Sequence, residues 1–214
     1  MLRLDGVSVS IGPVAILRDV DLDVDAGEFA GLIGRNGAGK TTLLRTIMGL
    51  TPATGKLEFE SVRLAGMPTH HRAGLGIGYM PEDRRLVPGL SAEENILLPA
   101  WAVGMHDAAA QLVRIYAAIP ELTVLRARKA SQLSGGQQKL VSLGRALMAG
   151  RKLLLLDEPF EGVAPVLARR LAEVISGLRK SGLSVILSEA SMTHARGLLD
   201  RLFLIDRGSV TPRS

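Results

Sequence analysis

The sequence predicts an α/β fold, in which a mostly parallel β-sheet follows an antiparallel β segment and is interrupted by inserted helices. Three observations indicate this. The first 30 residues alternate apolar and polar side chains, as half-buried antiparallel strands do. Continuous apolar runs at residues 29–33 and 153–156 have the length of fully buried strands. Between about residues 83 and 133 the spacing of apolar side chains is helical.

The composition is that of a folded, soluble chain. Its 214 residues are 47% apolar and 22% charged, which favours one compact domain and excludes disordered, collagen-like and coiled-coil proteins. The chain has no cysteine, which excludes disulfides and thiolate metal sites and suits a reducing compartment. The longest uncharged stretch in the middle, residues 95–105, contains Pro99 and Gly104 and is shorter than the roughly 20 residues that span a bilayer. Asp5 comes too early for a secretory signal.

The net charge of +5 is unevenly distributed. Residues 1–107 carry 10 basic and 13 acidic side chains (net −3), whereas residues 108–214 carry 16 and 8 (net +8). A basic half suggests a polyanionic partner, such as nucleotide phosphates, nucleic acid or an anionic membrane, although it is also typical of a solvated helical surface. Aromatic residues make up only 3%, which leaves little to stack on bases, so nucleic-acid binding is not expected.

Short strands and one helix are expected in the first part of the chain. A turn at Ala26 and Gly27 precedes the buried strand at residues 29–33. A glycine-rich loop then opens a helix over residues 40–48, which Gly49 ends. The other expected strands cover residues 2–4, 7–9, 20–24, 57–60 and 77–80.

Three helices are expected in the middle. Ser91 and Glu94 form a capping box that opens the first, Asp107 caps a second that Pro120 stops, and a third follows Gly136. Residues from about 83 to 133 are therefore predicted to form a helical insertion, with residues 1–82 and 134–214 forming the core.

The end of the chain returns to alternating strands and helices. After the apolar run at 153–156 we expect a helix over 165–180 and strands over 183–187 and 202–205, the last followed by a turn at 206–208. Strands that alternate with helices predict a mostly parallel sheet covered on both faces.

A phosphate-binding loop is the clearest motif. Residues 34–41 match G-x-x-x-x-G-K-[ST], where glycines let backbone N–H groups form an anion-binding nest and the following helix adds its dipole. Lys40 is expected to reach the β- and γ-phosphates and Thr41 to ligate Mg²⁺. An incidental glycine turn is the alternative, but this loop follows a buried strand and opens a helix. The residues expected to bind nucleotide here are Arg35, Asn36, Gly37, Ala38, Gly39, Lys40, Thr41 and Thr42.

Two acids follow the apolar run at 153–156. Asp157 is placed at the carboxyl edge of the sheet, where α/β proteins bind ligands, and is suited to hold Mg²⁺. Glu158 is suited to polarise the attacking water. Alone, such acids are often helix caps; together with the loop they indicate a hydrolytic site.

A second glycine pair occurs at a helix start. Ser134, Gly135, Gly136 and Gln137 would form another phosphate-seeking helix N-terminus, although a flexible cap is the alternative. A chain with one complete phosphate loop needs no second one for itself. Two chains packed head to tail would use both, with nucleotide between them.

Together these residues resemble the ATPase subunit of an ABC transporter over essentially the whole chain. The phosphate loop, the LSGGQ signature at residues 133–137 and the Walker B pair Asp157-Glu158 occur in the family's order. The resemblance implies a P-loop NTPase core and a dimer with a second ATPase subunit, identical or different. It also implies ATP and Mg²⁺ as ligands and attachment to integral membrane permease subunits at the cytoplasmic face of the membrane.

Residues 79–85, 90–95 and 158–165 resemble the second ATPase of branched-chain amino acid importers. In that group Glu82 stands at the position of the Q-loop glutamine, which implies a role near Mg²⁺ and the membrane partner; a surface acid paired with Arg84 or Arg85 is the alternative. The implied function is import of a small polar solute, a branched-chain amino acid or an amide, delivered by a solute-binding protein.

Three positions depart from the family pattern. Ile11 stands where an aromatic residue stacks on adenine, Ala190 where most relatives have the switch histidine, and Ala164 where the D-loop has aspartate. His194 could replace the switch histidine or be a surface residue. Losing the switch side chain predicts weakened turnover, by about 10²–10³ on the analogy of a single oxyanion-stabilising group, and leans toward a heterodimer with a more complete partner.

Two other functions remain open at this point. Non-transport ABC ATPases of nucleic-acid repair or translation usually carry two cassettes or long coiled-coil insertions, which do not fit in 214 residues. Lipid-export relatives share Glu-Pro-Phe-x-Gly-Val but continue with aspartate instead of Ala164.

Overall fold

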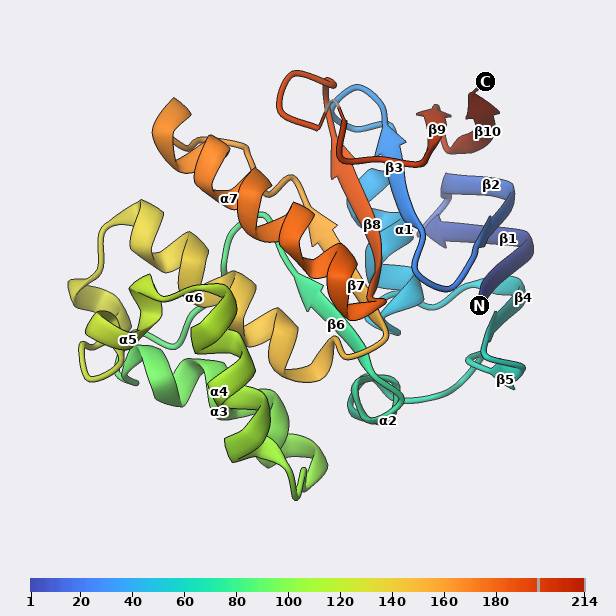
Figure 1. Ribbon diagram of the computed structural model, residues 1–214. Coiled ribbons are helices and arrows are strands. Elements are labelled where there is room, and N and C mark those ends of the chain that lie inside the picture. Colours follow the sequence, from blue (N-terminus) through green and yellow to red (C-terminus); the bar gives the residue numbers. More distant parts are fainter. Residues whose placement is uncertain (196, 214) are drawn as a thin grey trace.

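A computed structural model describes residues 1–195 and 197–213 (Figure 1). A six-stranded sheet lies beside a four-stranded antiparallel sheet, and helices pack around them on two apolar cores. Among the described residues, no helix is long and apolar enough to cross a membrane.

The antiparallel sheet contains the first strands of the chain. Its order is β2-β1-β4-β5, and alternate residues of β1, such as Leu2, Leu4, Val7 and Val9, are buried. The period-two pattern is therefore confirmed, although residues 2–4 and 7–9 belong to one continuous strand with irregular pairing. The strands are β1 (Leu2–Ile11), β2 (Val14–Val24), β4 (Thr54–Phe59) and β5 (Val62–Arg63).

The six-stranded sheet has the order β10-β9-β3-β8-β7-β6, and all its pairs are parallel except β9 with β10. Every residue of β7 and β8 is buried, which explains their continuous apolar sequence. The predicted fold class is confirmed. The strands are β3 (Phe29–Ile33), β6 (Ile77–Met80), β7 (Leu153–Asp157), β8 (Ser184–Glu189), β9 (Arg201–Asp206) and β10 (Ser209–Arg213). The strand β10 was not expected, because it contains Pro212 and because its residues are mostly exposed and lack the apolar pattern of a buried strand.

Two groups of helices accompany the sheet. The helices α3, α4, α5 and α6 gather on one side of it, while α1 and α7 lie against its faces (Figure 1). The division into core residues 1–82 and 134–214 and helical residues 83–133 remains a prediction. The helices are α1 (Lys40–Ile47), α2 (Thr69–Gly74), α3 (Ala92–Val103), α4 (Ala108–Ala118), α5 (Glu121–Leu125), α6 (Gly135–Ala149) and α7 (Pro165–Leu178), with short 3₁₀ helices η1 (Ala130–Gln132) and η2 (Arg179–Ser181).

Two of the predicted helix ends follow local chemistry, and a third does not. Ser91 and Glu94 form the expected capping box of α3, and Gly49, at φ +79°, follows α1. Asp107 precedes α4 but makes no capping hydrogen bond; its carboxylate pairs with Arg151 instead, at 3.3 Å. A nearby cation outside the helix therefore competes successfully for this side chain.

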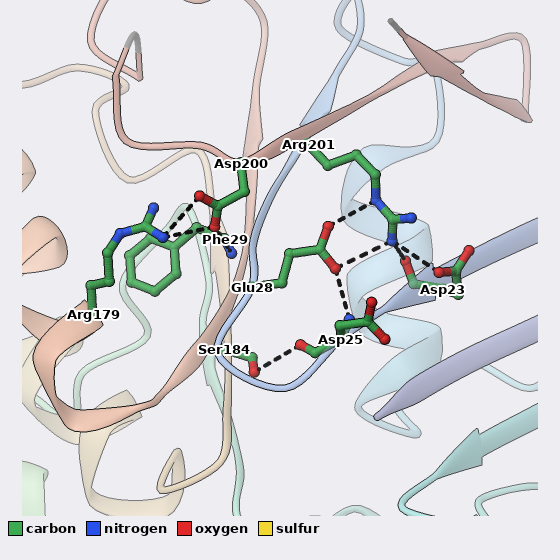
Figure 2. Close-up of polar contacts among 8 residues, drawn as sticks. All are labelled: Asp23, Asp25, Glu28, Phe29, Arg179, Ser184, Asp200 and Arg201. Carbon is green, nitrogen blue, oxygen red and sulfur yellow. Dashed lines mark hydrogen bonds and ion pairs between the residues drawn. The ribbon is translucent and has the colours of Figure 1, made fainter.

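The amino-terminal ends of β3, β8 and β9 share a network of paired charges (Figure 2). The Arg179 guanidinium donates to the Asp200 carboxylate at 2.8 Å and lies 4.3 Å from the centre of the Phe29 ring. Asp200 also accepts a hydrogen bond from the backbone N–H of Phe29 at 2.9 Å. Arg201 pairs with Asp23 at 3.0 Å and with Glu28 at 2.8 Å. The network fastens this end of the sheet to the loop that enters β3.

Candidate nucleotide-binding site

The phosphate loop runs from the end of β3 into α1. Gly39 is the N-cap of α1 with φ +113°, and a Cβ there would lie 2.9 Å from the Leu17 side chain. A Cβ on Gly34 would lie 2.3 Å from the Ile205 carbonyl oxygen. Both positions therefore require glycine, one for its backbone angle and both for close packing. These approaches hold the loop over the start of α1, where its N–H groups can meet an anion.

The Lys40 ammonium is buried inside this loop. It donates to the carbonyl oxygens of Gly34, at 2.6 Å, and Arg35, at 3.2 Å. It also pairs with the Glu158 carboxylate at 3.0 Å, and the two side chains are only 3% and 8% exposed. The structure thus joins the cation of the loop directly to the candidate catalytic carboxylate.

Asp157, at the end of β7, is the centre of a buried hydrogen-bond cluster. Its carboxylate accepts from the Ser188 hydroxyl at 2.8 Å, the Tyr79 hydroxyl at 3.0 Å and the Thr41 hydroxyl at 3.1 Å. Burial raises the Asp157 pKa, and these three hydrogen bonds oppose the shift. The same burial and the neighbouring Asp157 charge raise the Tyr79 pKa.

Glu158 has an unusual backbone conformation for a residue other than glycine, with φ +45°. Its N–H donates to the Ser188 carbonyl at 3.1 Å and hydroxyl at 3.2 Å. Its carbonyl accepts from the Lys139 ammonium at 3.1 Å and from the Glu161 N–H at 3.1 Å. Contacts on both sides of the residue therefore hold a strained backbone in place.

Glu82 lies just beyond the end of β6 and near Asp157 and Glu158, the two acids at the end of β7. Partial burial, followed by the charges of Glu158 and Asp157, raises its pKa. Glu82 remains exposed at the surface, but it pairs with neither arginine: Arg85 pairs with Asp83 at 2.8 Å, and Arg84 donates to the Gly135 carbonyl at 3.2 Å. The position next to Asp157 is compatible with a metal-linked role.

Thr41 and Asp157 fit one side of a Mg²⁺ site. Their oxygens lie 3.1 Å apart at the start of α1, and hydroxyl and carboxylate oxygens are the donors that Mg²⁺ prefers. Residues 1–195 and 197–213 contain no cluster of three or more acidic or histidine side chains placed for a metal. Mg²⁺ usually binds one or two protein side chains and completes its shell with phosphate and water.

The glycine pair of the second motif opens α6. Ser134 caps the helix by accepting from the Gln137 N–H at 3.3 Å, and the Gln137 side chain accepts from the Ser134 N–H at 3.0 Å. In Figure 1 this end of α6 lies away from β3 and α1. The structure brings the phosphate loop, Asp157, Glu158 and Glu82 together, but does not add Ser134, Gly135, Gly136 and Gln137 to that cluster.

Comparison with known proteins agrees with this arrangement. The family model for the ABC transporter matches residues 17–161, which is more than half of the chain. The chain belongs to the ABC transporter family. It is one of the family's ATPase subunits.

Relatives of this ABC ATPase include importer and exporter subunits. BraG of Pseudomonas aeruginosa, described as a high-affinity branched-chain amino acid transport ATP-binding protein, is 37% identical, covering 98% of this chain and 91% of BraG. The lipopolysaccharide export ATP-binding protein LptB of Escherichia coli is 33% identical, covering 90% of this chain and 81% of LptB.

Solved structures share the fold of this ABC ATPase. An ATP-binding subunit of an ABC transporter matches with a TM-score of 0.87 and 28% identity, covering 100% of this chain and 90% of that chain. An ABC transporter cassette in its ADP conformation matches with a TM-score of 0.83 and 27% identity, covering 99% and 89%.

The three positions predicted to depart from the family pattern are all accessible in this ABC ATPase. Ile11 is 59% exposed at the end of β1, and Ala190 is exposed just after β8. Ala164 occupies the N-cap of α7 without a side-chain hydrogen bond. His194 lies in a turn and is exposed, and its ring is 5.7 Å from the Phe160 ring.

Sequence reasoning assigned no role to four residues of the site: Tyr79, Lys139, Ser188 and Glu189. Ser188 and Tyr79 are polar positions within apolar strands, and that signal could have identified them. Burial raises the pKa of Glu189 to about 7, while its carboxylate accepts from the Phe160 N–H at 3.2 Å. Lys139 and Glu189 carry no signal of their own, because charged residues near a helix start or a strand end are normally solvated.

Proposed function

We propose that this chain binds ATP with Mg²⁺ and hydrolyses it to drive import of a small polar solute, a branched-chain amino acid or an amide. The observation that best supports this proposal is the contact between the phosphate loop and the two acids at the end of β7. Lys40 pairs with Glu158 at 3.0 Å, and Thr41 donates to Asp157 at 3.1 Å. A phosphate loop and strand-end acids that are separate in the sequence form one site.

The resting contacts suggest how the catalytic carboxylate becomes available. Arg35, Asn36, Gly37, Ala38, Gly39, Lys40, Thr41 and Thr42 are the residues proposed to surround the phosphates. A triphosphate at Lys40 competes with Glu158 for the same ammonium. When Lys40 turns to phosphate, the Glu158 carboxylate is released to accept a proton from the attacking water.

Thr41, Asp157 and Glu82 are the residues proposed to hold Mg²⁺, directly or through water. The ion would neutralise charge on the β- and γ-phosphate oxygens. Tyr79 and Ser188 fix the Asp157 carboxylate from two sides, so that it faces Thr41 without rearrangement.

The site is proposed to be completed by a second ATPase subunit, identical or different. The first N–H groups of α6 have no partner within the helix, and the Ser134 cap satisfies that of Gln137. Gly135 and Gly136 therefore present N–H groups that suit the γ-phosphate of nucleotide on another subunit.

A groove beside the metal end of the site is proposed to receive the membrane permease. Its volume is about 720 Å³, and its lining residues include Thr41 and Asp157 together with Pro99, Ala102 and Val103 of α3. Glu82 and Arg85 line it as well, so a segment seated there would touch the loop that follows β6. The subunit would then act at the cytoplasmic face of the membrane, with a solute-binding protein acting through the permease.

Two observations favour import over lipid export: the greater similarity of this chain to BraG than to LptB, and the residue at position 164. BraG resembles this chain over more of its length than LptB does. Ala164 also differs from the aspartate of the lipid-export pattern. A non-transport ATPase is the remaining alternative.

The test has a binding arm and a transport arm. Lys40→Ala is expected to weaken binding of a fluorescent ATP analogue by about 100-fold or more, because the variant removes the cation of the phosphate cradle. Co-expression with the permease subunits of a branched-chain amino acid importer from the same organism should yield a complex that accumulates labelled leucine or a small amide in vesicles. Unchanged nucleotide affinity in Lys40→Ala would refute the site, and purification without any integral membrane protein would refute the transport role.

A further inference from the structure

One face of α6 is directed at carbonyl oxygens of the loop that follows β6. Lys139, Ser142 and Arg145 occur every three residues along this face. The Ser142 hydroxyl donates to the Arg84 carbonyl at 3.3 Å, and Arg145 donates to the carbonyls of Arg84 and Arg85. The helix α6, which begins within the LSGGQ signature, is therefore attached to the segment that begins at Glu82 and is called the signature helix below.

Lys139 differs from the other two in what it reaches. Its ammonium lies within hydrogen-bond distance of three carbonyl oxygens, those of Glu158 at 3.1 Å, Glu82 at 3.4 Å and Glu161 at 3.5 Å. An ammonium has three N–H donors, so this arrangement can use all of them. One side chain thus connects the signature helix with the segment after β6 and the segment after β7.

The burial of Lys139 indicates a specific role. The residue is only 3% exposed, and no carboxylate of residues 1–195 and 197–213 lies within ion-pair distance of its ammonium. A buried charge is unfavourable unless its surroundings compensate for it, and an apolar residue would suit the packing of α6 as well as Leu140 and Leu143 do. Compared with an apolar side chain at this position, the Lys139 ammonium adds the contacts with the carbonyl oxygens.

We propose that Lys139 is a positioning residue that sets the backbone, and thereby the carboxylate direction, of the catalytic Glu158. This inference rests on the proposed function. Ser188 holds the N–H of Glu158 and Lys139 holds its carbonyl, on either side of a backbone at φ +45°. Once Lys40 leaves Glu158 for phosphate, these backbone contacts are what still orients the carboxylate.

The position of Lys139 also gives α6 two tasks. Gly135 and Gly136, at the start of the helix, are proposed to face the partner's nucleotide, and Lys139 lies about one turn further on. The same rigid turn that contacts the nucleotide of one site therefore holds Glu158 of the other.

The experiment compares three variants of the full chain in steady-state ATP hydrolysis. Lys139→Met keeps the apolar stem and removes the ammonium, Lys139→Gln keeps two N–H donors without charge, and Ser142→Ala is the matched control on the same helix face. We expect Lys139→Met to lower kcat by about 10- to 100-fold, as a small misplacement of a catalytic group does, with KM and ATP-analogue affinity within about threefold of the wild type. Lys139→Gln should recover part of the loss, and Ser142→Ala should match the wild type.

A double variant separates positioning from general loosening of the fold. In a Glu158→Gln background, Lys139→Met should cause no further loss of residual turnover, because the group that it positions is already gone. A kcat for Lys139→Met within twofold of an active wild type, or an equal additional loss in the Glu158→Gln background, would overturn the inference. If Lys139→Met does not fold, Lys139→Gln carries the same comparison. A wild type that binds no ATP or does not hydrolyse it would instead refute the proposed function.

Discussion

The two ends of the six-stranded sheet differ in how deeply their charged side chains are buried. At the amino-terminal end, Arg179 and Asp200 are both less than half exposed, at 42% and 44%, yet remain in contact with water, and these two side chains pair with each other (Figure 2). At the carboxyl end Lys40, Lys139, Asp157, Glu158 and Glu189 are all less than a tenth exposed. Only the first arrangement is what stability alone would favour.

The difference shows which end of the sheet lowers the stability of the fold for the sake of function. Partly exposed ion pairs contribute at most about 1 kcal/mol each and require little desolvation. Buried charges lose water that their partners do not fully replace, and burial accordingly shifts the pKa values of Asp157 and Glu189 upward and that of Lys139 downward. We interpret the carboxyl end as a site where ionisable groups are buried for function, at a cost in stability.

The largest effect is expected from Glu158→Gln. The amide is nearly isosteric and can still accept from Lys40, so the melting temperature should change little, whereas kcat should fall by about 10²–10⁴ because the proton acceptor is lost. Thermal melts and steady-state hydrolysis on the same preparation measure both quantities. Equal losses in stability and activity would mean that the two ends of the sheet do not differ as described.

A gain of activity is expected from Ala190→His. Ala190 is exposed beyond β8, so a larger side chain can be accommodated. If Ala190 occupies the switch position, as the family resemblance implies, an imidazole there should add a phosphate contact worth up to about 10²–10³ in rate. Ala190→Leu is the matched control without hydrogen-bonding atoms. If kcat is the same in both variants, the missing switch side chain does not limit turnover in this chain.

A pH-dependent difference in stability is expected from Glu189→Gln. The folded pKa of about 7 exceeds the unfolded value near 4.5, so ionisation penalises the folded state as pH rises between these values and the penalty is complete above about pH 8. Glu189→Gln should therefore gain stability relative to the wild type between about pH 5 and 8, by up to about 3 kcal/mol. Urea denaturation of the wild type and of Glu189→Gln across this pH range measures the difference in stability.

The smallest effect is expected at the opposite end of the sheet. Arg179→Ala removes a half-exposed ion pair and a contact with the Phe29 ring, which together contribute about 1 kcal/mol. Stability should fall by that amount and by less in high salt, with kcat unchanged. A loss of activity in this variant would show that the paired end is coupled to the site.

Most of the fold and half of the site could be predicted from local sequence. The predicted boundaries of β3 and β6 match the structure to the residue. Each is a short apolar run flanked by residues that do not continue a strand, so its ends are clear in the sequence. The strand β10 was missed because its pattern is mostly exposed, and Asp107 was wrongly assigned a capping hydrogen bond because Arg151, far along the chain, attracts it.

The sequence by itself determined which residues form the phosphate loop and which acids face it, because glycine angles, a helix start and a strand end are local properties of consecutive residues. Only the tertiary structure decided how the buried charges are balanced: Lys40 against Glu158, Tyr79 and Ser188 against Asp157, and Lys139 against three carbonyls. The partners in these pairs come from different strands and helices. They meet only because β3, β8, β7 and β6 lie side by side with their carboxyl ends at one edge.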